Sequence, residues 1–282
     1  MQLSGLGDRW EASIRATHNR GMETFVPPTR GQGMQLEQLV RELRDVAEGH
    51  GDLEAAREDA AALDLQLVEL DRHLLLQDQS PRGWGTALFR RGESRGLVVE
   101  VPHPGSDYRT PELGLRFFEE SGADVYLLSG ANRYNRADPS LEQPNRRLSD
   151  AAHSAATFFH AAHCGLVEPR DRVLQVHGFG SQEGDPTVVI SDGQDDGHDP
   201  PALIALAARL EQAEVPNLIA DFESPLGKRL GGKTNLQAQN RNTTFLHMEV
   251  SEAARRELDP KLVRAVAEWA GEESSSCSAN QG

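Results

Sequence analysis

The sequence predicts an α/β fold: a mixed, mainly parallel β-sheet with helices on both faces, preceded by a helical N-terminal extension. Two observations predict this fold. From Trp84 onward, short apolar runs typical of strands alternate with helical patterns. Such alternation indicates a parallel sheet covered by helices. Before Trp84, apolar residues recur at spacings of three and four, which is the period of an amphipathic helix.

The N-terminal region divides at a glycine-containing break. Residues 1–33 hold glycine, proline and charges without a sustained period, and they are expected to be loosely packed. Two helices follow on either side of Gly49-His50-Gly51, and the second has an apolar stripe made of Leu63, Leu67, Leu70 and Leu74. We therefore expect residues 1–80 to form a helical extension. A coiled-coil arm is the alternative, but the pattern lasts too few heptads to favour it.

The main domain is predicted over residues 84–270. Its expected strands are residues 97–99, 124–128, 173–176, 187–191 and 244–250. Its expected helices are residues 112–120, 149–164, 201–213 and 260–270. Residues 271–282 are polar and are predicted to be a disordered tail.

Composition and charge exclude several classes of partner. The chain has 282 residues and a formal net charge of −15, without a basic run, so nucleic acid and anionic membranes are not expected partners. It also lacks the ~18 consecutive apolar residues of a membrane span. The N-terminus does not resemble a signal peptide, so a soluble protein is expected, either cytoplasmic or exported with its signal removed. The two cysteines, Cys164 and Cys277, predict neither a disulfide framework nor a thiolate zinc site.

Polar side chains follow three of the predicted strands. His103 comes after LVVEVP, His177 ends VLQVH, and Glu249 ends TFLHME. Because sites in parallel sheets form at the carboxyl ends of the strands, these residues can share one pocket. A catalytic zinc needs three protein ligands and an open position for water. A nearby carboxylate can accept the proton of that water.

The third ligand is expected close to His103, because one short loop can supply two ligands. Asp107 lies four residues on, and Pro104 and Gly105 between them make a turn that can fold its carboxylate back. Glu112 is the alternative, although it is expected on the following helix. A single histidine after a strand is more often a hydrogen-bonded structural residue. Two histidines with acidic partners favour a metal site more strongly.

A rival hypothesis starts from His177-Gly178-Phe179-Gly180. A strand followed by His-Gly-x-Gly resembles the oxyanion loop of α/β-hydrolases. That fold needs a serine in a downstream G-x-S-x-G elbow, and the chain has none. A serine hydrolase is therefore not predicted.

Three segments together resemble the poly-γ-glutamate hydrolase and N-formylglutamate amidohydrolase group of zinc enzymes. The segments are PHPGSDYRTPEL, VLQVHGFG and FLHMEVSEAARR, and the resemblance extends over residues 84–269. It implies a carboxypeptidase-like fold, with zinc held by His103, Asp107 and His177 and with Glu249 as the catalytic carboxylate. The chain departs from the group's pattern in two places. The spacing from His103 to the acid is one residue shorter, and Glu252 stands where the group tends to have arginine, with Arg255 near a second basic position.

Substrate contacts are predicted in two loops. The segment ANRYNR is similar to the Asn-Arg segment that holds a substrate carboxylate in carboxypeptidase-like enzymes, which points to Arg133 and Arg136. Arginine suits this task because its fork pairs with a carboxylate through two hydrogen bonds. A solvated basic loop is the alternative. Asn235, in the glycine-rich segment GGKTN, is a further expected contact. His247 shares a strand face with Glu249 and is expected to lie beside it.

The predicted function is a zinc-dependent hydrolase that cleaves an amide bond: a peptide, a γ-glutamyl or an N-acyl amino acid linkage. Its substrate would be a small molecule or peptide that carries a carboxylate. The alternative is a catalytically inactive binding or regulatory protein of the same fold. Metal content distinguishes the two, because a protein that has lost catalysis need not hold zinc.

Overall fold

A computed structural model describes residues 25–78, 80, 82–135, 147–240 and 243–278. It divides into two compact units, each made of three stretches of the chain. Unit 1 comprises residues 1–93, 101–106 and 127–167, and unit 2 comprises residues 94–100, 107–126 and 168–282, in each case as far as they are described.

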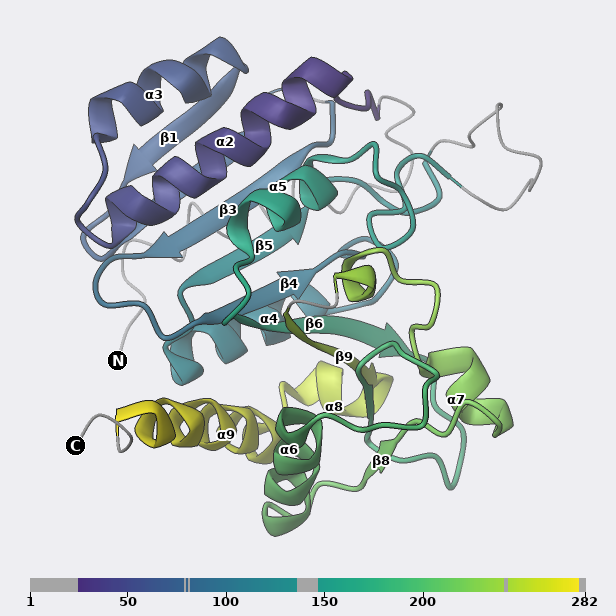
Figure 1. Ribbon diagram of the computed structural model, residues 1–282. Helices are drawn as coiled ribbons and strands as arrows, with labels where there is room; N and C mark the ends of the chain where they lie inside the picture. The colour runs from purple at the N-terminus through teal and green to yellow at the C-terminus, as the bar shows by residue number, and fades with distance from the viewer. Residues whose placement is uncertain (1–24, 79, 81, 136–146, 241–242, 279–282) are drawn as a thin grey trace. The chain divides into compact units, whose positions relative to one another are not determined.

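Unit 1 pairs two long helices with antiparallel strands. Its elements are α2 (Arg30–Ala47), α3 (Leu53–Ala62), β1 (Leu65–Glu69), β2 (His73–Asp78), β3 (Gly85–Arg90) and α5 (Phe158–Leu166). Helix α2 starts at a capping box between Thr29 and Gln32, and it lies beside α5 (Figure 1). Gly165 permits this close approach, because a Cβ there would lie 2.3 Å from the carbonyl oxygen of Glu37.

Two predictions for unit 1 are corrected. The second N-terminal helix ends at Ala62, and the leucines expected to form its stripe lie largely in the hairpin of β1 and β2. Asp64, with φ of 54°, ends the helix, and β1 then alternates between buried and exposed residues. The spacings of four, three and four among these leucines fit a helix, but a spacing of four also fits a strand, so the pattern does not exclude strands. The helix expected over residues 149–164 begins only at Phe158, because Thr157 is its N-cap and accepts from the backbone N–H of His160.

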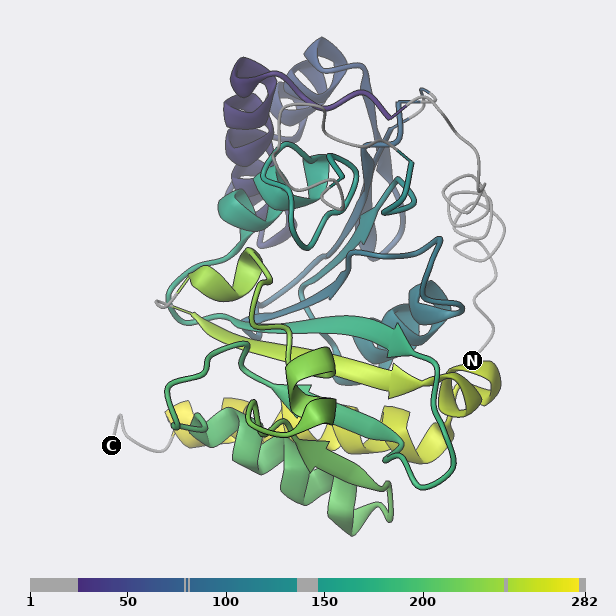
Figure 2. The same cartoon turned by 90° about the vertical axis from the view of Figure 1, so that its right-hand side faces the viewer.

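Unit 2 contains the remaining helices and most of the parallel pairing. Its helical elements are α4 (Thr110–Ser121), α6 (Pro201–Gln212), α7 (Pro225–Leu230), the 3₁₀ turn η1 (Gln237–Gln239), α8 (Glu252–Glu257) and α9 (Pro260–Ser278). Its strands are β6 (Arg172–Phe179), β7 (Val188–Ser191), β8 (Asn217–Ile219), β9 (Thr244–Ser251) and nearly all of β4 (Leu97–Val101). Helices α6 and α9 lie side by side (Figure 2).

The C-terminal helix is longer than expected. Helix α9 continues to Ser278, past the predicted domain end at residue 270, and residues 279–282 lie outside the described part. Glu272 and Glu273 are good helix formers, and the sequence between them and Ser278 contains no proline.

The strands of the described residues form one mixed sheet. With β5 (Val125–Ser129) included, their order is β1-β2-β3-β5-β4-β6-β9-β7-β8. Strands β4, β6 and β9 are parallel neighbours, whereas β7 runs antiparallel to β9. The predicted mixed α/β fold is confirmed. No helix in the described part of the chain combines the length and apolarity that crossing a bilayer requires.

The buried ring of His73 on β2 makes stability depend on pH. Its side chain is 4% exposed, and burial, assisted by the charges of Arg90 and Arg72, lowers its pKa from 6.5 to about 4. Between these two values the unfolded chain binds the proton and the folded chain does not. The contribution of a neutral His73 is therefore complete above pH 6.5 and is lost as the pH falls toward 4.

We expect urea unfolding to report this loss. From pH 7 to pH 5 the wild type should lose about 1–2 kcal/mol more stability than His73→Gln, whose side chain does not titrate. An equal pH dependence of the two proteins would contradict the assignment to His73.

Candidate metal centre

The loop between β4 and α4 carries two of the predicted ligands. His103 and Asp107 are both buried, at 1% and 8% exposure. The loop ends in a defined turn: the Thr110 hydroxyl donates to the carbonyl of Asp107 at 2.7 Å, and Arg109 adopts a left-handed φ of 61°. Proximity in sequence and this turn hold the two side chains in one short segment.

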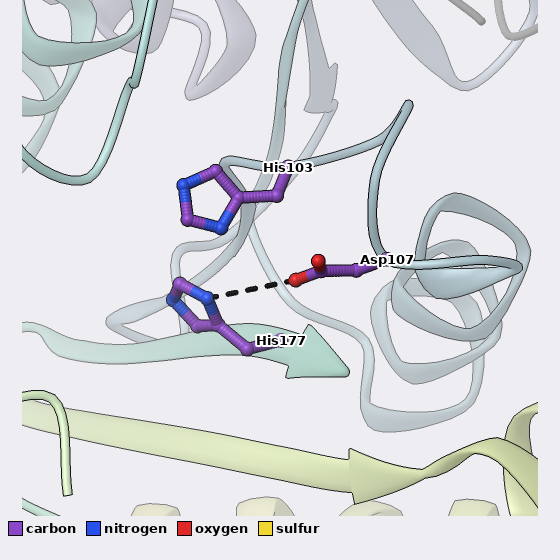
Figure 3. Close-up of side chains that lie close together, drawn as sticks. All are labelled: His103, Asp107 and His177. Atoms are coloured by element: carbon purple, nitrogen blue, oxygen red, sulfur yellow. Dashed lines mark ion pairs between the residues drawn. The ribbon is translucent and has the colours of Figure 1, made fainter. Parts of the chain in front are cut away.

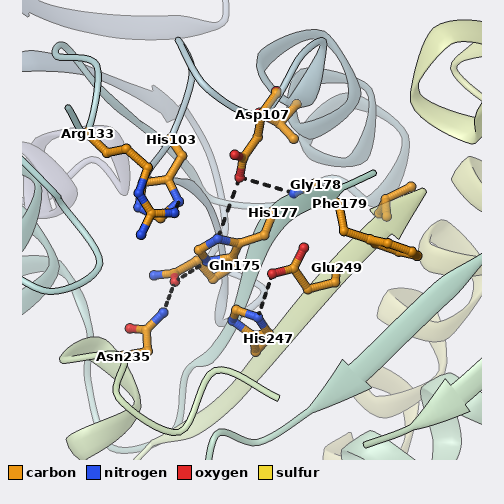
Figure 4. A network of polar contacts seen from close by, with 12 residues as sticks. His103, Asp107, Arg133, Gln175, His177, Gly178, Phe179, Asn235, His247 and Glu249 are labelled. Carbon is orange, nitrogen blue, oxygen red and sulfur yellow. Dashed lines mark hydrogen bonds and ion pairs between the residues drawn. The ribbon is translucent and has the colours of Figure 1, made fainter. Parts of the chain in front are cut away.

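In unit 2, His177 on β6 lies between a carboxylate and an amide. Its Nδ1 is 3.8 Å from Asp107 Oδ2, and its Nε2 is 2.8 Å from Gln175 Oε1. Asp107 Oδ2 also accepts the backbone N–H of Gly178 at 3.1 Å. These contacts fix the Asp107 carboxylate beside the imidazole (Figures 3 and 4).

The hydrogen bonds of Gln175 determine which nitrogen of His177 carries the proton. The Gln175 amide nitrogen donates to Glu100 Oε2 at 2.8 Å, so its oxygen is the atom that faces His177. Asn235 Nδ2 donates to the same oxygen. An amide oxygen can only accept, so His177 Nε2 must bear the hydrogen. Nδ1 is then the nitrogen with a lone pair, and it faces Asp107.

Glu249 and His247 line the neighbouring strand β9. Glu249 is paired with His177 in the parallel ladder. Its Oε1 is 3.4 Å from His247 Nε2, while its buried Oε2 has no hydrogen-bond partner among the described residues. The rings of His247 and His177 are 4.3 Å apart. His247 therefore lies beside Glu249, as predicted from the strand period.

In unit 1, Asp150 gathers three basic side chains. It accepts from His103 Nε2 at 2.9 Å, from His153 Nδ1 at 3.0 Å, and from Arg133 Nη2 at 2.8 Å. Burial acts to raise the pKa of Asp150, but the hydrogen bonds to both histidines and the charge of Arg133 hold it far below its ordinary value. Arg133 Nη1 lies 3.2 Å from His103 Nδ1. His103 thus has the same tautomer as His177, with the hydrogen on Nε2.

Among the described residues, two groups of side chains that each lie within one unit bring metal-binding atoms within 4.8 Å of one another. They are His103/Asp150/His153 in unit 1 and His177/His247/Glu249 in unit 2. Of the set predicted from the sequence, Asp107 and His177 lie together in unit 2 (Figure 3), and His103 precedes Asp107 in the β4–α4 loop. Glu112, the alternative third ligand, lies in the first turn of α4 and belongs to none of these groups.

Two other predicted substrate contacts, Arg136 and Asn235, are not among these metal-binding groups. Arg136 lies outside the described residues. Asn235 is 1% exposed, with Nδ2 on Gln175 and Oδ1 accepting the backbone N–H of Gln237. Asn235 therefore supports the polar network under His177.

Two supporting residues, Gln175 and Asp150, were not predicted from the sequence. Gln175 lies two positions before His177, and the strand period of two would have placed both side chains on one face. Asp150 lies in the segment that was expected to be helical, which instead forms turns before Phe158. Its distance in sequence from His103 gave no signal of their contact.

Comparisons with known proteins find similarity only among solved structures. Searches with family models and among curated proteins give no match. A bacteriophage poly-γ-glutamate hydrolase is 15% identical, with a TM-score of 0.42, over 70% of this chain and 91% of that one. N-formylglutamate amidohydrolase from Ralstonia eutropha JMP134 is 14% identical, with a TM-score of 0.45, over 70% and 99%. The zinc-free apo form of YNDL is 16% identical, with a TM-score of 0.42, over 71% and 93%.

Both enzyme groups that the sequence motifs resemble are thus among the similar structures. At 14–16% identity, these similarities concern the fold alone.

The Gln175 network predicts a measurable loss of stability. Gln175→Met keeps the volume, but it removes a donor from buried Glu100 and an acceptor from buried Asn235. We expect the free energy of unfolding to fall by about 2–4 kcal/mol in urea titrations. Gln66→Met, at an exposed position of β1, should change it by less than about 0.5 kcal/mol. Equal effects of the two substitutions would contradict the importance of the network.

Proposed function

We propose that this protein is a zinc-dependent hydrolase of amide bonds, with the metal held by His103, Asp107 and His177. The observation that carries the proposal is the Glu249 carboxylate. One of its oxygens is buried without a hydrogen-bond partner among the described residues, and it belongs to the residue paired with His177 in the ladder. Buried polar atoms are nearly always hydrogen-bonded, and this one lies on the residue beside His177, where a water or substrate can supply the missing partner.

The chemistry of the proposed ligands fits zinc. Two imidazoles and a carboxylate are a common ligand set for catalytic zinc. In each histidine, Nε2 is hydrogen-bonded to an acceptor: Asp150 for His103 and Gln175 for His177. Metal-binding histidines typically use their second nitrogen in this way, which orients the ring and makes the binding nitrogen more basic. Zinc at His103 Nδ1 would require Arg133 Nη1 to leave its present contact.

The reaction would be hydrolysis by an activated water. When bound, zinc polarises the amide carbonyl and lowers the pKa of water toward ~7. Glu249 then acts as general base: it accepts a proton from the water through its unpartnered oxygen and passes it to the leaving amine. His247 Nε2 lies 3.4 Å from the other oxygen, close enough to pair with the carboxylate when the ring is protonated.

Arg133 is the proposed contact for a substrate carboxylate. Its Nε and Nη2 are held by Asp150 at 3.1 and 2.8 Å, so its orientation is fixed before substrate binds. Nη1 points toward His103 and is the donor that metal binding would release. A guanidinium held in this way suits a substrate that carries a carboxylate near the scissile amide, as peptides and N-acyl amino acids do.

Metal content tests the proposed ligand set. We expect about one zinc per purified chain, as a three-ligand catalytic site requires, measured by elemental analysis. His103→Ala and His177→Ala should each lose zinc. A wild-type protein that neither contains nor takes up zinc would favour a binding protein of the same fold.

The substitution Glu249→Gln distinguishes a general base from a metal ligand. Its zinc content should stay at the wild-type level, while hydrolysis should fall by about 10²–10⁴-fold because an amide cannot accept the proton. The assay would screen N-acyl amino acids and γ-linked peptides. Glu211→Gln, the same change at an exposed position of α6, is the control and should keep full activity. Loss of zinc from Glu249→Gln would make Glu249 a ligand, and unchanged activity would make it structural.

A further inference from the structure

Arg255 on α8 is a buried arginine that bonds to three backbone segments of unit 2. It is 3% exposed. Its Nε donates to the carbonyl of Val250 at the end of β9, at 3.0 Å. Its Nη2 donates to Phe179 at the end of β6, at 3.0 Å, and its Nη1 to Tyr108 in the β4–α4 loop, at 2.6 Å. One side chain thus ties together two strand ends and the residue that follows Asp107.

Gly178 connects this arginine with Asp107. A Cβ at position 178 would lie 2.3 Å from Arg255 Cζ, so the guanidinium occupies the space that a side chain would fill. The backbone N–H of the same glycine donates to Asp107 Oδ2. A shift of Arg255 would therefore reach Asp107 by two routes: through Tyr108, its chain neighbour, and through the position of Gly178.

The loop needs this support because its conformation is strained. Arg109 has a φ of 61°, which is unfavourable for a residue other than glycine. Two further contacts hold the loop against α8: Arg109 Nη1 donates to the carbonyl of Arg256, and the Arg256 guanidinium lies 5.1 Å from the Tyr108 ring centre. Residues of helix α8 therefore hold residues 108–109 in place through these contacts.

We propose that Arg255 is the positioning residue that holds Asp107 in the geometry of a metal ligand. Each of its three nitrogens donates to a backbone carbonyl, so it acts through the backbone and not on substrate. Lysine cannot replace it, because a single ammonium does not reproduce the planar fork that reaches three separated oxygens. The inference rests on the proposed function, since the role of Asp107 as ligand is proposed there.

Amide hydrogen exchange in the metal-free protein tests this role without using activity. In Arg255→Met and Arg255→Lys, exchange at the Gly178 amide should accelerate about tenfold or more, while Leu174 inside β6 changes much less. Arg264→Met, which removes a 64% exposed guanidinium on α9, should alter neither amide. Unchanged protection of Gly178, or equal acceleration of both amides, would overturn the proposal.

Zinc affinity and chemical rescue supply the functional readout. Both Arg255 variants should bind zinc about 10–100-fold more weakly than the wild type, and Arg264→Met should bind it normally. In Arg255→Ala, guanidinium chloride far below denaturing concentrations should restore Gly178 protection, and sodium chloride of equal ionic strength should not. Equal effects of the two salts would overturn a specific guanidinium role. If the wild type takes up no zinc, the proposed function fails, and the Gly178 comparison still decides the positioning role.

Discussion

The parallel pairing of β6 with β9 in a single register is the constraint on which the candidate site depends. That register sets Gln175 opposite His247 and His177 opposite Glu249. Because side chains alternate along a strand, these four polar residues share one face. A slip of one residue would turn one strand's polar pair to the opposite face. The fully buried Leu174, Val176 and Met248 make such a slip costly, so the apolar core also fixes the position of the chemistry.

Burying this many polar groups is stable only when their hydrogen bonds are made. Glu100 and Gln175 are fully buried. The amide of Gln175 bonds to the carboxylate of Glu100 on β4 and to the imidazole of His177 on its own strand, β6. In a low-dielectric interior such a chain of bonds is strong when complete and expensive when one member is missing. The same bonds determine the tautomer of His177. Stability and the proposed reactivity therefore depend on the same atoms.

The sequence predicted well those features that depend on local pattern. Apolar runs that stop at a polar residue predicted the strands β6 and β9, which carry His177 and Glu249, and the strand β4, which is followed by His103. Features that depend on long-range contact were not predictable. The bond between His103 and Asp150 joins residues 47 positions apart, and the role of Arg255 depends on three carbonyls from separate segments. The helix predicted from the leucines of residues 63–74 was wrong for another reason. Their spacing fits a helix, and the strand conformation becomes stable only because β2 pairs with β3.

The glycines after His177 illustrate how one pattern can serve two different physical needs. His-Gly-x-Gly suggested an oxyanion loop, in which glycines expose backbone N–H groups to a substrate. Here the backbone N–H of Gly178 donates to Asp107. Because Gly178 has no side chain, the guanidinium of Arg255 can pack against its backbone. Gly180 has nothing within 4 Å of where a Cβ would be, so packing does not require glycine there. The motif therefore reflects the packing of a buried arginine against a strand end. A short glycine-containing motif identifies a chemistry only when the atoms that approach each glycine are known.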